Sequence, residues 1–497
     1  MQFISTRTGG ASVGAAEAIL RGLAPDGGLY VPECLPRLSL EDIDALRPLT
    51  YAQRARRVLG ALLDGLPRRE LGEAIDAAYA SFDDPRVAPL APLSDGVYAL
   101  ELFHGPTLAF KDVALQLLPR LMTLSMRERG ETREALILAA TSGDTGKAAL
   151  EGFADVLGTR CAVFYPRAGV SEAQRLQMVT QRGGNTHVIA VEGNFDDAQT
   201  GVKRIFADAE FGRRLSQRGI VLSSANSINF GRLAPQVVYY FSAYADLLES
   251  GAIRAGEEVN FCVPTGNFGN ILAGWYARCC GLPVGRLICA SNRNNVLSDF
   301  LALGRYEVAD RPFYRTASPS MDILISSNLE RLLFELCGRD AARVRDWMAS
   351  LAADGRYDVG AQALAALRQT FAGGFADDAQ TLQEIGRVFA RDGYLMDTHT
   401  AVASRVLADY RARTGDARTT VLVSTASPYK FGRAVLGAIA GEQAAEGLDD
   451  FACCDALARA TGTRVPEPIK QLPRLPVRHT QVCQKDDMEA ALLRVLP

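Results

Sequence analysis

Short, unbroken apolar runs alternate with helical periodicity from residue 95 onward. The runs cover residues 135–140, 161–165, 187–191, 219–223, 258–263, 286–290 and 420–424. Most are continuous rather than alternating, as expected for strands that helices cover on both faces. Amphipathic stretches between them, such as 146–157, 171–182 and 232–249, favour right-handed β-α-β crossovers. The pattern therefore predicts an α/β protein built on open parallel sheets.

The pattern also divides the chain. A loop-rich start leads into helical periodicity around 40–62 and 69–81, and a proline-rich stretch from Asp83 to Pro92 is typical of a linker. We expect an N-terminal domain over residues 1–85, a catalytic region over 95–435 and a C-terminal extension over 436–497 that packs back over the core. Within the catalytic region, residues 293–418 are expected to be mostly helical.

Composition indicates an ordinary globular chain. The 497 residues are 48% hydrophobic and carry a formal charge of −3, which excludes a disordered or collagen-like protein and argues against nucleic acid as a partner. Ten cysteines without a CxxC pair and only four histidines make a metal site improbable. The sequence shows no signal-peptide pattern and no uncharged apolar run of about 18 residues. We therefore expect a cytoplasmic protein that neither spans nor binds a membrane.

Lysine is scarce in this chain. Only six of the 54 cationic residues are lysines, at 111, 147, 203, 430, 470 and 485. Unlike arginine, lysine can lose a proton and attack a carbonyl carbon. Each remaining lysine is therefore a candidate for chemistry that arginine cannot perform.

Two of the apolar runs end in loops that suit anions. Thr141-Ser142-Gly143-Asp144-Thr145-Gly146 follows the first run, and Pro264-Thr265-Gly266-Asn267-Phe268-Gly269-Asn270 follows the fifth. A small-residue loop that opens a helix presents backbone N–H groups and the positive end of the helix dipole. Neither loop matches G-x-G-x-x-G or GxxxxGK[ST], which disfavours a nucleotide enzyme. Two cradles suggest two small anions, although ordinary tight turns would look the same.

Lys111 lies between Phe110 and Val113, in the segment from His104 to Asp112. Desolvation by apolar neighbours would lower its pKa and favour a neutral nucleophile. From this segment alone, a surface lysine paired with Asp112 is the better interpretation. Lys147, in the first turn of the helix after the first loop, is expected to point to solvent.

Two more polar clusters follow predicted strands. The segment from Asn226 to Arg232 offers amide, hydroxyl and guanidinium donors for a phosphate, or a polar turn with a helix cap. The segment from Ser424 to Phe431 closes the last strand with hydroxyl groups that could hold a neutral ring nitrogen or cap a helix.

Taken in order, these segments resemble the threonine synthases, which use pyridoxal phosphate (PLP) and have the fold type II (tryptophan synthase β-like) architecture. The resemblance includes Ser5-Thr6-Arg7, residues 25–32, His104 to Asp112, Thr141 to Gly146, Asn226 to Arg232, Gly266 to Asn270, Ser318 to Ile323 and Thr425 to Phe431. It implies two open parallel-sheet domains with the site between them and an extra N-terminal module. The activity implied is that of a carbon–oxygen lyase, which converts O-phospho-L-homoserine and water to L-threonine and phosphate.

The resemblance also implies roles for individual residues. Lys111 would be the catalytic lysine that carries PLP covalently, and Thr425 would hold the pyridine nitrogen. The cofactor phosphate would bind at Gly266, Asn267, Phe268, Gly269 and Asn270. The substrate would be bound by Thr141, Ser142, Gly143, Asp144, Thr145, Asn226, Ser227 and Arg232. A monomer or a homodimer is expected.

Two positions depart from the pattern of the resemblance. Asp144 stands where many members of the wider group carry Asn, and a carboxylate there must either be protonated or face away from an anionic substrate. Ala-Ser-Pro-Tyr-Lys follows Thr425, where many threonine synthases read Ala-His-Pro. Two alternatives stay open at this point: a phospho-lyase that releases 2-oxobutyrate, and a metabolite-binding homologue without catalysis.

Overall fold

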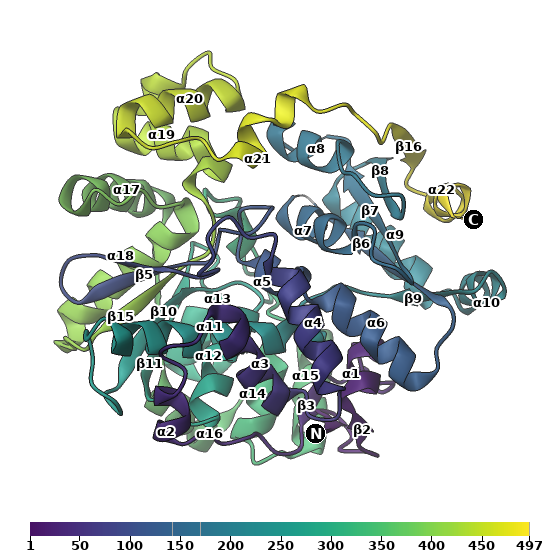
Figure 1. Cartoon of the computed structure of the whole chain (residues 1–497), viewed down its shortest axis with the longest axis horizontal. Helices are drawn as coiled ribbons and strands as arrows, with labels where there is room; N and C mark the ends of the chain where they lie inside the picture. The colour runs from purple at the N-terminus through teal and green to yellow at the C-terminus, as the bar shows by residue number, and fades with distance from the viewer. Residues whose placement is uncertain (142, 169, 497) are drawn as a thin grey trace.

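The computed structural model describes residues 1–141, 143–168 and 170–496 of the chain (Figure 1). Two sheets dominate it. The small sheet has five parallel strands in the order β16-β8-β7-β6-β9. Its strands are β6 (Glu134–Ala140), β7 (Thr159–Pro166), β8 (Thr186–Glu192), β9 (Ile220–Ser223) and β16 (Gln481–Gln484).

The large sheet has six strands in the order β14-β11-β10-β15-β5-β4, and only its edge strand β4 runs antiparallel. Its strands are β4 (Leu90–Pro92), β5 (Val97–Glu101), β10 (Val259–Pro264), β11 (Val284–Ser291), β14 (Phe371–Phe375) and β15 (Thr420–Ser424). All seven apolar runs of the sequence are strands of these two sheets, so the predicted α/β class with open parallel sheets is confirmed.

Strand β14 was not expected, because residues 293–418 were predicted to be mostly helical. Its sequence, FAGGF, carries two glycines that weaken the strand signal. The structure explains one of them: a Cβ at Gly374 would lie 2.7 Å from the side chain of Val406, on the helix that crosses this strand. The close approach of α18 (Thr398–Thr414) therefore requires a residue without a side chain there.

Helices cover both sheets (Figure 1). Those around the small sheet are α6 (Leu118–Arg129), α7 (Asp144–Phe153), α8 (Glu172–Val179), α9 (Phe195–Ala207), α10 (Ala209–Gln217) and α22 (Met488–Val495). Those of the large-sheet half are α5 (Lys111–Leu115), α11 (Phe230–Glu249), α12 (Gly269–Cys279), α13 (Val296–Leu303), α14 (Leu329–Leu336), α15 (Ala341–Asp354), α16 (Gly360–Thr370), α17 (Asp378–Asp392), α18, α19 (Gly432–Ala440), α20 (Asp450–Thr461) and α21 (Glu467–Lys470). None of the described helices is both long and apolar enough to cross a membrane.

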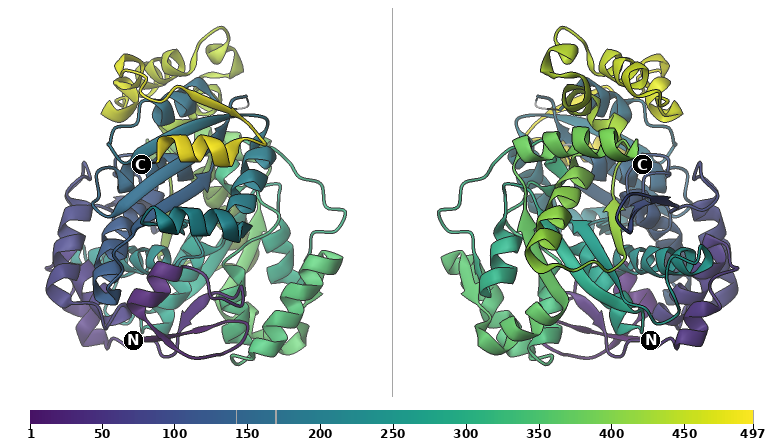
Figure 2. Two further views of the ribbon diagram at one scale, coloured as in Figure 1. Left: turned by 90° about the vertical axis from the view of Figure 1, so that its right-hand side faces the viewer. Right: turned by 90° about the vertical axis from the view of Figure 1, so that its left-hand side faces the viewer.

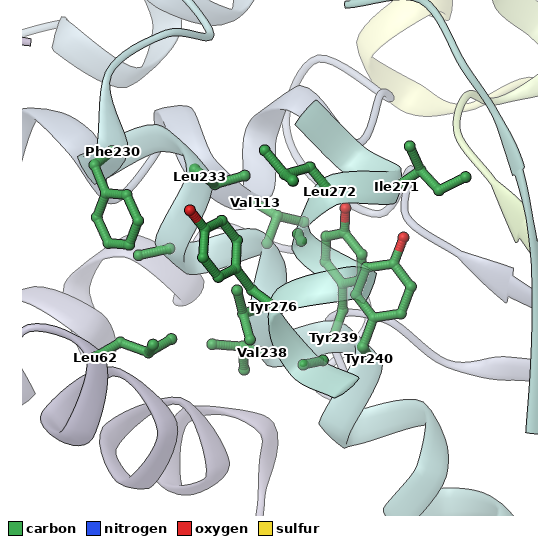
Figure 3. Close-up of a cluster of buried hydrophobic side chains, with 14 of the residues drawn as sticks. Leu62, Val113, Phe230, Leu233, Val238, Tyr239, Tyr240, Ile271, Leu272 and Tyr276 are labelled. Carbon is green, nitrogen blue, oxygen red and sulfur yellow. The ribbon is translucent and has the colours of Figure 1, made fainter. Parts of the chain in front are cut away.

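Helix α11 forms the centre of the main hydrophobic core (Figure 3). Eighteen of its 20 residues are buried, so the helix is enclosed by other elements on every face, and most of its residues are apolar. The ring of Phe230 packs 4.8 Å from that of Phe3, and the ring of Tyr240 packs 4.8 Å from that of Phe261 on β10. One helix thus connects the N-terminal strands to the large sheet.

The N-terminal residues fold into a three-stranded antiparallel sheet and four helices. These are β1 (Gln2–Ser5), β2 (Val13–Gly14), β3 (Tyr30–Pro32), α1 (Ala15–Arg21), α2 (Leu40–Asp44), α3 (Tyr51–Leu62) and α4 (Arg68–Tyr79). Arg54 of α3, only 5% exposed, donates hydrogen bonds to Ser242 and Asp246 of α11. Because the apolar residues of this segment belong to the same core cluster as α11, the module has no separate core.

The C-terminal segment lies along the small sheet, away from the N-terminal strands (Figure 1). After α20 and α21 the chain passes the small sheet, where β16 pairs in parallel with β8 and α22 packs beside it (Figures 1 and 2). The last strand of the small sheet therefore comes from the end of the chain, some 260 residues after β9.

Candidate active site

The loops at the carboxyl ends of both sheets converge, as expected for a parallel α/β protein. From the small sheet come the loop between β6 and α7 and the loop between β9 and α11. From the large sheet come the loop between β10 and α12 and the turn η2 (Pro428–Phe431) after β15. Helix α5, which begins at Lys111, and the turn η1 (Pro319–Met321) complete the group.

Lys111 lies at the meeting point of these elements. Its Nζ is 3.2 Å from Ser320 Oγ and 3.5 Å from Asp144 Oδ2, and the side chain is only 10% exposed. Burial lowers the pKa of this amine; nearby Asp144 opposes that effect, whereas Lys430 and Arg232 reinforce it. A lysine in this state is closer to a neutral nucleophile than a surface lysine is.

The alternative of a surface lysine paired with Asp112 is wrong. The Asp112 carboxylate accepts hydrogen bonds from the Thr107 backbone N–H at 2.8 Å and from the Thr107 hydroxyl at 2.7 Å. Gly105 permits this arrangement, since a Cβ there would lie 2.4 Å from the Asp112 side chain. Asp112 therefore shapes the turn before α5 and leaves the lysine amine to other partners.

Asp144 lies between two lysines. Its Oδ1 is 2.9 Å from Lys430 Nζ, while its Oδ2 faces Lys111 and accepts a 3.4 Å hydrogen bond from Ser320 Oγ. Burial by itself would raise the pKa of Asp144, but the positive charges of Lys430 and Lys111 together hold it well below its usual range. The carboxylate is thus ionised, and it is directed at cations.

The loop before α12 has the features of an anion cradle. No side chain among the described residues caps this helix, and Phe268 stands before its first residue with a φ of 62°, an uncommon conformation for a bulky residue that recurs at ligand-binding turns. Asn270 receives hydrogen bonds from Tyr239 and Tyr240 on its Oδ1, yet its buried Nδ2 has no partner among the described residues.

The same loop is closely packed against the turn η1. A Cβ at Gly266 would lie 2.9 Å from the Ser320 carbonyl oxygen, and the backbone carbonyls of Gly266 and Asn267 accept hydrogen bonds from Ser326 and Asn328. Unsatisfied donors at a helix N-terminus, next to a buried amine, fit a phosphate-bearing cofactor such as PLP.

Thr425 is held beside Lys111 by the backbone. The Phe110 N–H donates to the Thr425 carbonyl at 2.8 Å, and the Ser427 N–H donates to the Leu108 carbonyl at 3.0 Å. Ala109 and Ala426 form the bridge between these two hydrogen bonds. Residues more than 300 positions apart are thereby brought to the same place.

The loop 141–145 is organised by its first residue. The Thr141 hydroxyl accepts hydrogen bonds from the backbone N–H groups of Gly143 and Gly146 at 3.0 and 3.1 Å. A Cβ at Gly146 would collide with the Thr141 side chain, so this turn requires glycine there. Thr145 is half-buried at the start of α7, and the predicted site residue Ser142 lies outside the described residues.

The first turn of α11 contains a buried arginine that has no carboxylate partner among the described residues. Arg232 is 5% exposed and donates to the Ala225 carbonyl at 2.7 Å, and none of the described residues forms an ion pair with it. Burial lowers its pKa to about 10. Nearby, Ser227 N–H and Ser227 Oγ both donate to the exposed Asn226 side chain. An uncompensated buried cation is costly, and an anionic ligand would relieve that cost.

Three further residues of the site were missed at the level of sequence. Ser320 contacts both Lys111 and Asp144, although its segment was recognised only as part of the resemblance. The Ser320 N–H donates to His399 Nε2 at 3.1 Å, so His399 carries its proton on Nδ1, which contacts Asp397 Oδ2 at 2.7 Å. The buried Asp397 side chain caps α18 and orients the ring.

The expectation for Lys147 was wrong. Its side chain is 15% exposed rather than solvent-facing, and its Nζ contacts Glu151 at 2.7 Å and Gln181 at 2.6 Å. Glu151, on α7 itself, neutralises a cation that would otherwise oppose the helix dipole, and Gln181, just beyond α8, accepts a further hydrogen bond from it.

Comparison with known proteins agrees with this arrangement. Residues 2–79 match the family described as "Threonine synthase N terminus", and residues 85–426 match the family described as "Pyridoxal-phosphate dependent enzyme". The threonine synthase of Pseudomonas aeruginosa is 43% identical over 436 residues, which are 88% of this chain and 90% of that protein.

Human threonine synthase-like 1 is 41% identical over 435 residues, and the match spans 85% of this chain but only 58% of that longer protein. Among solved structures, a PLP-bound threonine synthase from Brucella melitensis superposes with a TM-score of 0.89 at 39% identity, and it covers 100% of this chain and 99% of its own. The yeast threonine synthase also gives 0.89, at 31% identity, with 99% and 98% covered. The chain belongs to the threonine synthase family of pyridoxal-phosphate-dependent enzymes.

Proposed function

We propose that this protein converts O-phospho-L-homoserine and water to L-threonine and phosphate, with PLP as cofactor. The observation that carries the proposal is a buried lysine amine with a lowered pKa, and two features for binding anions lie near it. The first is the start of α12, where no side chain caps the helix and the buried Asn270 Nδ2 has no partner among the described residues. The second is the buried Arg232, which has no carboxylate partner among the described residues and whose charge acts on Lys111. A phosphorylated amino acid and a phosphorylated aldehyde cofactor together would use all three features.

The cofactor would be held by residues of the large-sheet half. Lys111 would carry it covalently, the N–H groups of Gly266, Asn267, Phe268, Gly269 and Asn270 would bind its phosphate, and Thr425 would donate or accept at its ring nitrogen. When bound, PLP supplies an electron sink that acidifies the protons next to the substrate amino group.

The substrate would be held mainly by residues of the small-sheet half. Its carboxylate would bind in the loop of Thr141, Ser142, Gly143, Asp144 and Thr145. Its phosphate would bind at Asn226, Ser227 and Arg232, where bidentate guanidinium contacts suit a phosphate.

Lys111 would move the protons of the reaction. As a neutral amine it would take the proton from Cα and then one from Cβ. Arg232 would stabilise the phosphate as it leaves Cγ, because that group gains negative charge while the bond breaks. One proton would return to Cγ, which becomes the methyl group, and one to Cα. Water would add its hydroxyl at Cβ and give up its proton to the released phosphate, and Lys111 would recover its link to the cofactor as threonine leaves.

Product analysis tests this proposal. The purified protein, saturated with PLP, is incubated with O-phospho-L-homoserine, and threonine, phosphate and 2-oxobutyrate are quantified by chromatography. We expect threonine and phosphate in equal amounts. Phosphate with 2-oxobutyrate but no threonine would instead identify a phospho-lyase, and no turnover by a PLP-loaded protein would identify a non-catalytic homologue.

Absorption spectroscopy tests the role of Lys111 separately. The wild-type protein reconstituted with PLP should show a visible band, and Lys111→Ala should lose it. Lys470→Ala provides a matched control, since that lysine lies on α21, outside the group of converging loops. A colourless wild-type protein after reconstitution would contradict the proposed cofactor chemistry.

We also infer a division into residues 1–85, 95–435 and 436–497, and a reducing, cytoplasmic location. The location is supported by ten cysteines that are all free, seven of them buried. An oligomer no larger than a dimer is expected, which size-exclusion chromatography with light scattering can test.

A further inference from the structure

A buried ion pair links the two halves of the site. Lys430 lies on η2, after the large-sheet strand β15, and Asp144 begins α7, after the small-sheet strand β6. Their charged atoms are 2.9 Å apart, and the side chains are only 4% and 9% exposed. Lys430 Nζ also donates to the Thr107 carbonyl at 2.8 Å, which fixes its position next to the turn before α5.

The Asp144 carboxylate contacts two lysine amines at unequal distances. Lys430 is 2.9 Å from one oxygen, whereas Lys111 is 3.5 Å from the other. Ser320 Oγ lies within 3.4 Å of that second oxygen and within 3.2 Å of the Lys111 amine. The shorter contact, and therefore the stronger one, is with the lysine that the proposed reaction does not use.

The charges around Lys111 make this division important. Asp144 from α7 attracts the Lys111 proton, while Lys430 from η2 and Arg232 from α11 repel it. His399 from α18 also faces Asp144, and Asp112 lies within reach of the Lys430 charge. If Lys430 were neutral, Lys111 would be the remaining ion-pair partner of Asp144. An ammonium group in such a pair can neither attack a carbonyl nor accept a proton.

We propose that Lys430 is a positioning residue, which takes up the charge of Asp144 across the junction of the two sheets and so leaves the Lys111 amine free to react. This inference rests on the proposed function, because it assigns Lys111 a reaction that requires its neutral form. It also explains why a carboxylate is tolerated in the substrate loop, since the negative charge of Asp144 is compensated by Lys430.

A purely structural role for the pair makes a different prediction. A buried ion pair that only holds two halves together costs stability when one member is lost, because the other charge is left unpaired, and the loss of both members can restore that stability. In that case none of these changes alters the protonation of Lys111. A charge-compensating role predicts instead that the pKa of Lys111 rises when Lys430 alone is removed and returns when Asp144 is removed with it, because Lys111 then has neither the added attraction nor the added repulsion. The protonation of Lys111 in the two single variants and the double variant, rather than their stability, therefore separates the two explanations.

The test measures the protonation of Lys111 directly. Full-length protein without PLP is labelled with trace acetic anhydride over a wide pH range, and the modification of Lys111 is read by peptide mass spectrometry. Lys430→Gln should move the labelling midpoint of Lys111 upward by about one pH unit or more, with about a tenfold loss of labelling rate at neutral pH. Asp144→Asn should move it downward, and the double variant should return close to the wild type.

Lys147→Gln is the matched control. It removes a half-buried lysine from an ion pair on the same helix α7, yet the partners of that lysine are Glu151 and Gln181 rather than Asp144. This variant should leave the labelling of Lys111 unchanged. An unchanged midpoint in Lys430→Gln, or a double variant that is no better than Lys430→Gln, would overturn the inference.

The pH dependence of threonine formation gives a second readout. In the PLP-loaded protein, the acid limb of the kcat profile should move to higher pH in Lys430→Gln and return in the double variant. If the wild-type protein forms no threonine, the proposed function fails while the labelling experiment still decides whether Lys430 controls Lys111.

Discussion

Replacing Arg232 by methionine should remove an anion site without destabilising the fold. The guanidinium is 5% exposed, forms a hydrogen bond with the Ala225 carbonyl and has no carboxylate partner among the described residues. Burial lowers its pKa from 12.5 to about 10. A difference of 2.5 pH units corresponds to about 3 kcal/mol, which is the approximate cost of keeping this group charged in the folded protein at neutral pH.

The variant loses one favourable contact and one unfavourable charge. The lost hydrogen bond from a charged donor contributes about 1.5–3 kcal/mol. Because this is no larger than the cost of burying the charge, we expect the free energy of unfolding to be unchanged or to rise by about 1 kcal/mol. With phosphate bound, the wild type should become the more stable protein. At a hundred times its Kd, inorganic phosphate would stabilise the wild type by about 2.7 kcal/mol and the variant hardly at all.

Denaturant unfolding of the PLP-loaded proteins, with and without inorganic phosphate, measures both effects. Arg331→Met is the control. Arg331 is fully buried and burial also lowers its pKa to about 10, but it donates to Tyr30, Ile228 and Asn328. Its loss should destabilise the fold by several kcal/mol, because three acceptors lose their donor. If Arg232→Met is equally destabilising and phosphate stabilises it as much as the wild type, Arg232 is a structural residue and the reasoning is refuted.

Two further substitutions test the surroundings of Lys111. Gly266→Ala would place a Cβ 2.9 Å from the Ser320 carbonyl, and the resulting strain of about 1–3 kcal/mol should weaken PLP binding about fivefold or more in a fluorescence titration. Gly212→Ala, on the open side of α10, should leave that affinity unchanged, and equal affinities in all three proteins would contradict the packing argument. Burial raises the pKa of Asp112 to about 6, so the folded protein favours the protonated side chain. The free energy of unfolding should therefore fall as pH rises from 3.8 to about 6. Asp112→Asn, which can still bond Thr107, should make the free energy of unfolding less dependent on pH in this range, and an unchanged slope would show that Asp112 ionises normally.

The sequence was most informative where the physical signal is local. Runs such as 135–140 and 258–263 are strands because they are apolar, short and bounded by loops, and a parallel sheet buried on both faces requires that pattern. Strand β14 gave no such signal, because it contains two glycines, and one of them, Gly374, serves the close approach of α18, a contact that depends on the folded chain.

The contacts of the site follow a different logic. Lys111 was identified from its neighbours in sequence, but its relation to Asp112 was open until the Thr107 hydrogen bonds accounted for that carboxylate. Asp144 and Lys430 are separated by 286 residues, and only the packing of the two sheets brings them within 2.9 Å. No periodicity or spacing within either segment could have predicted that pair.

The sequence by itself determined the α/β class, the strands that carry the loops and the short list of residues able to do the chemistry, because these depend on burial patterns and on side-chain types. The tertiary structure decided which of those groups are charged and which face each other. Electrostatic energy depends on distance and on exclusion of water, and both are properties of the folded chain alone. The sequence shows Lys111 as one of only six lysines. Only the fold shows that a second lysine, Lys430, pairs with Asp144, the carboxylate that also faces Lys111.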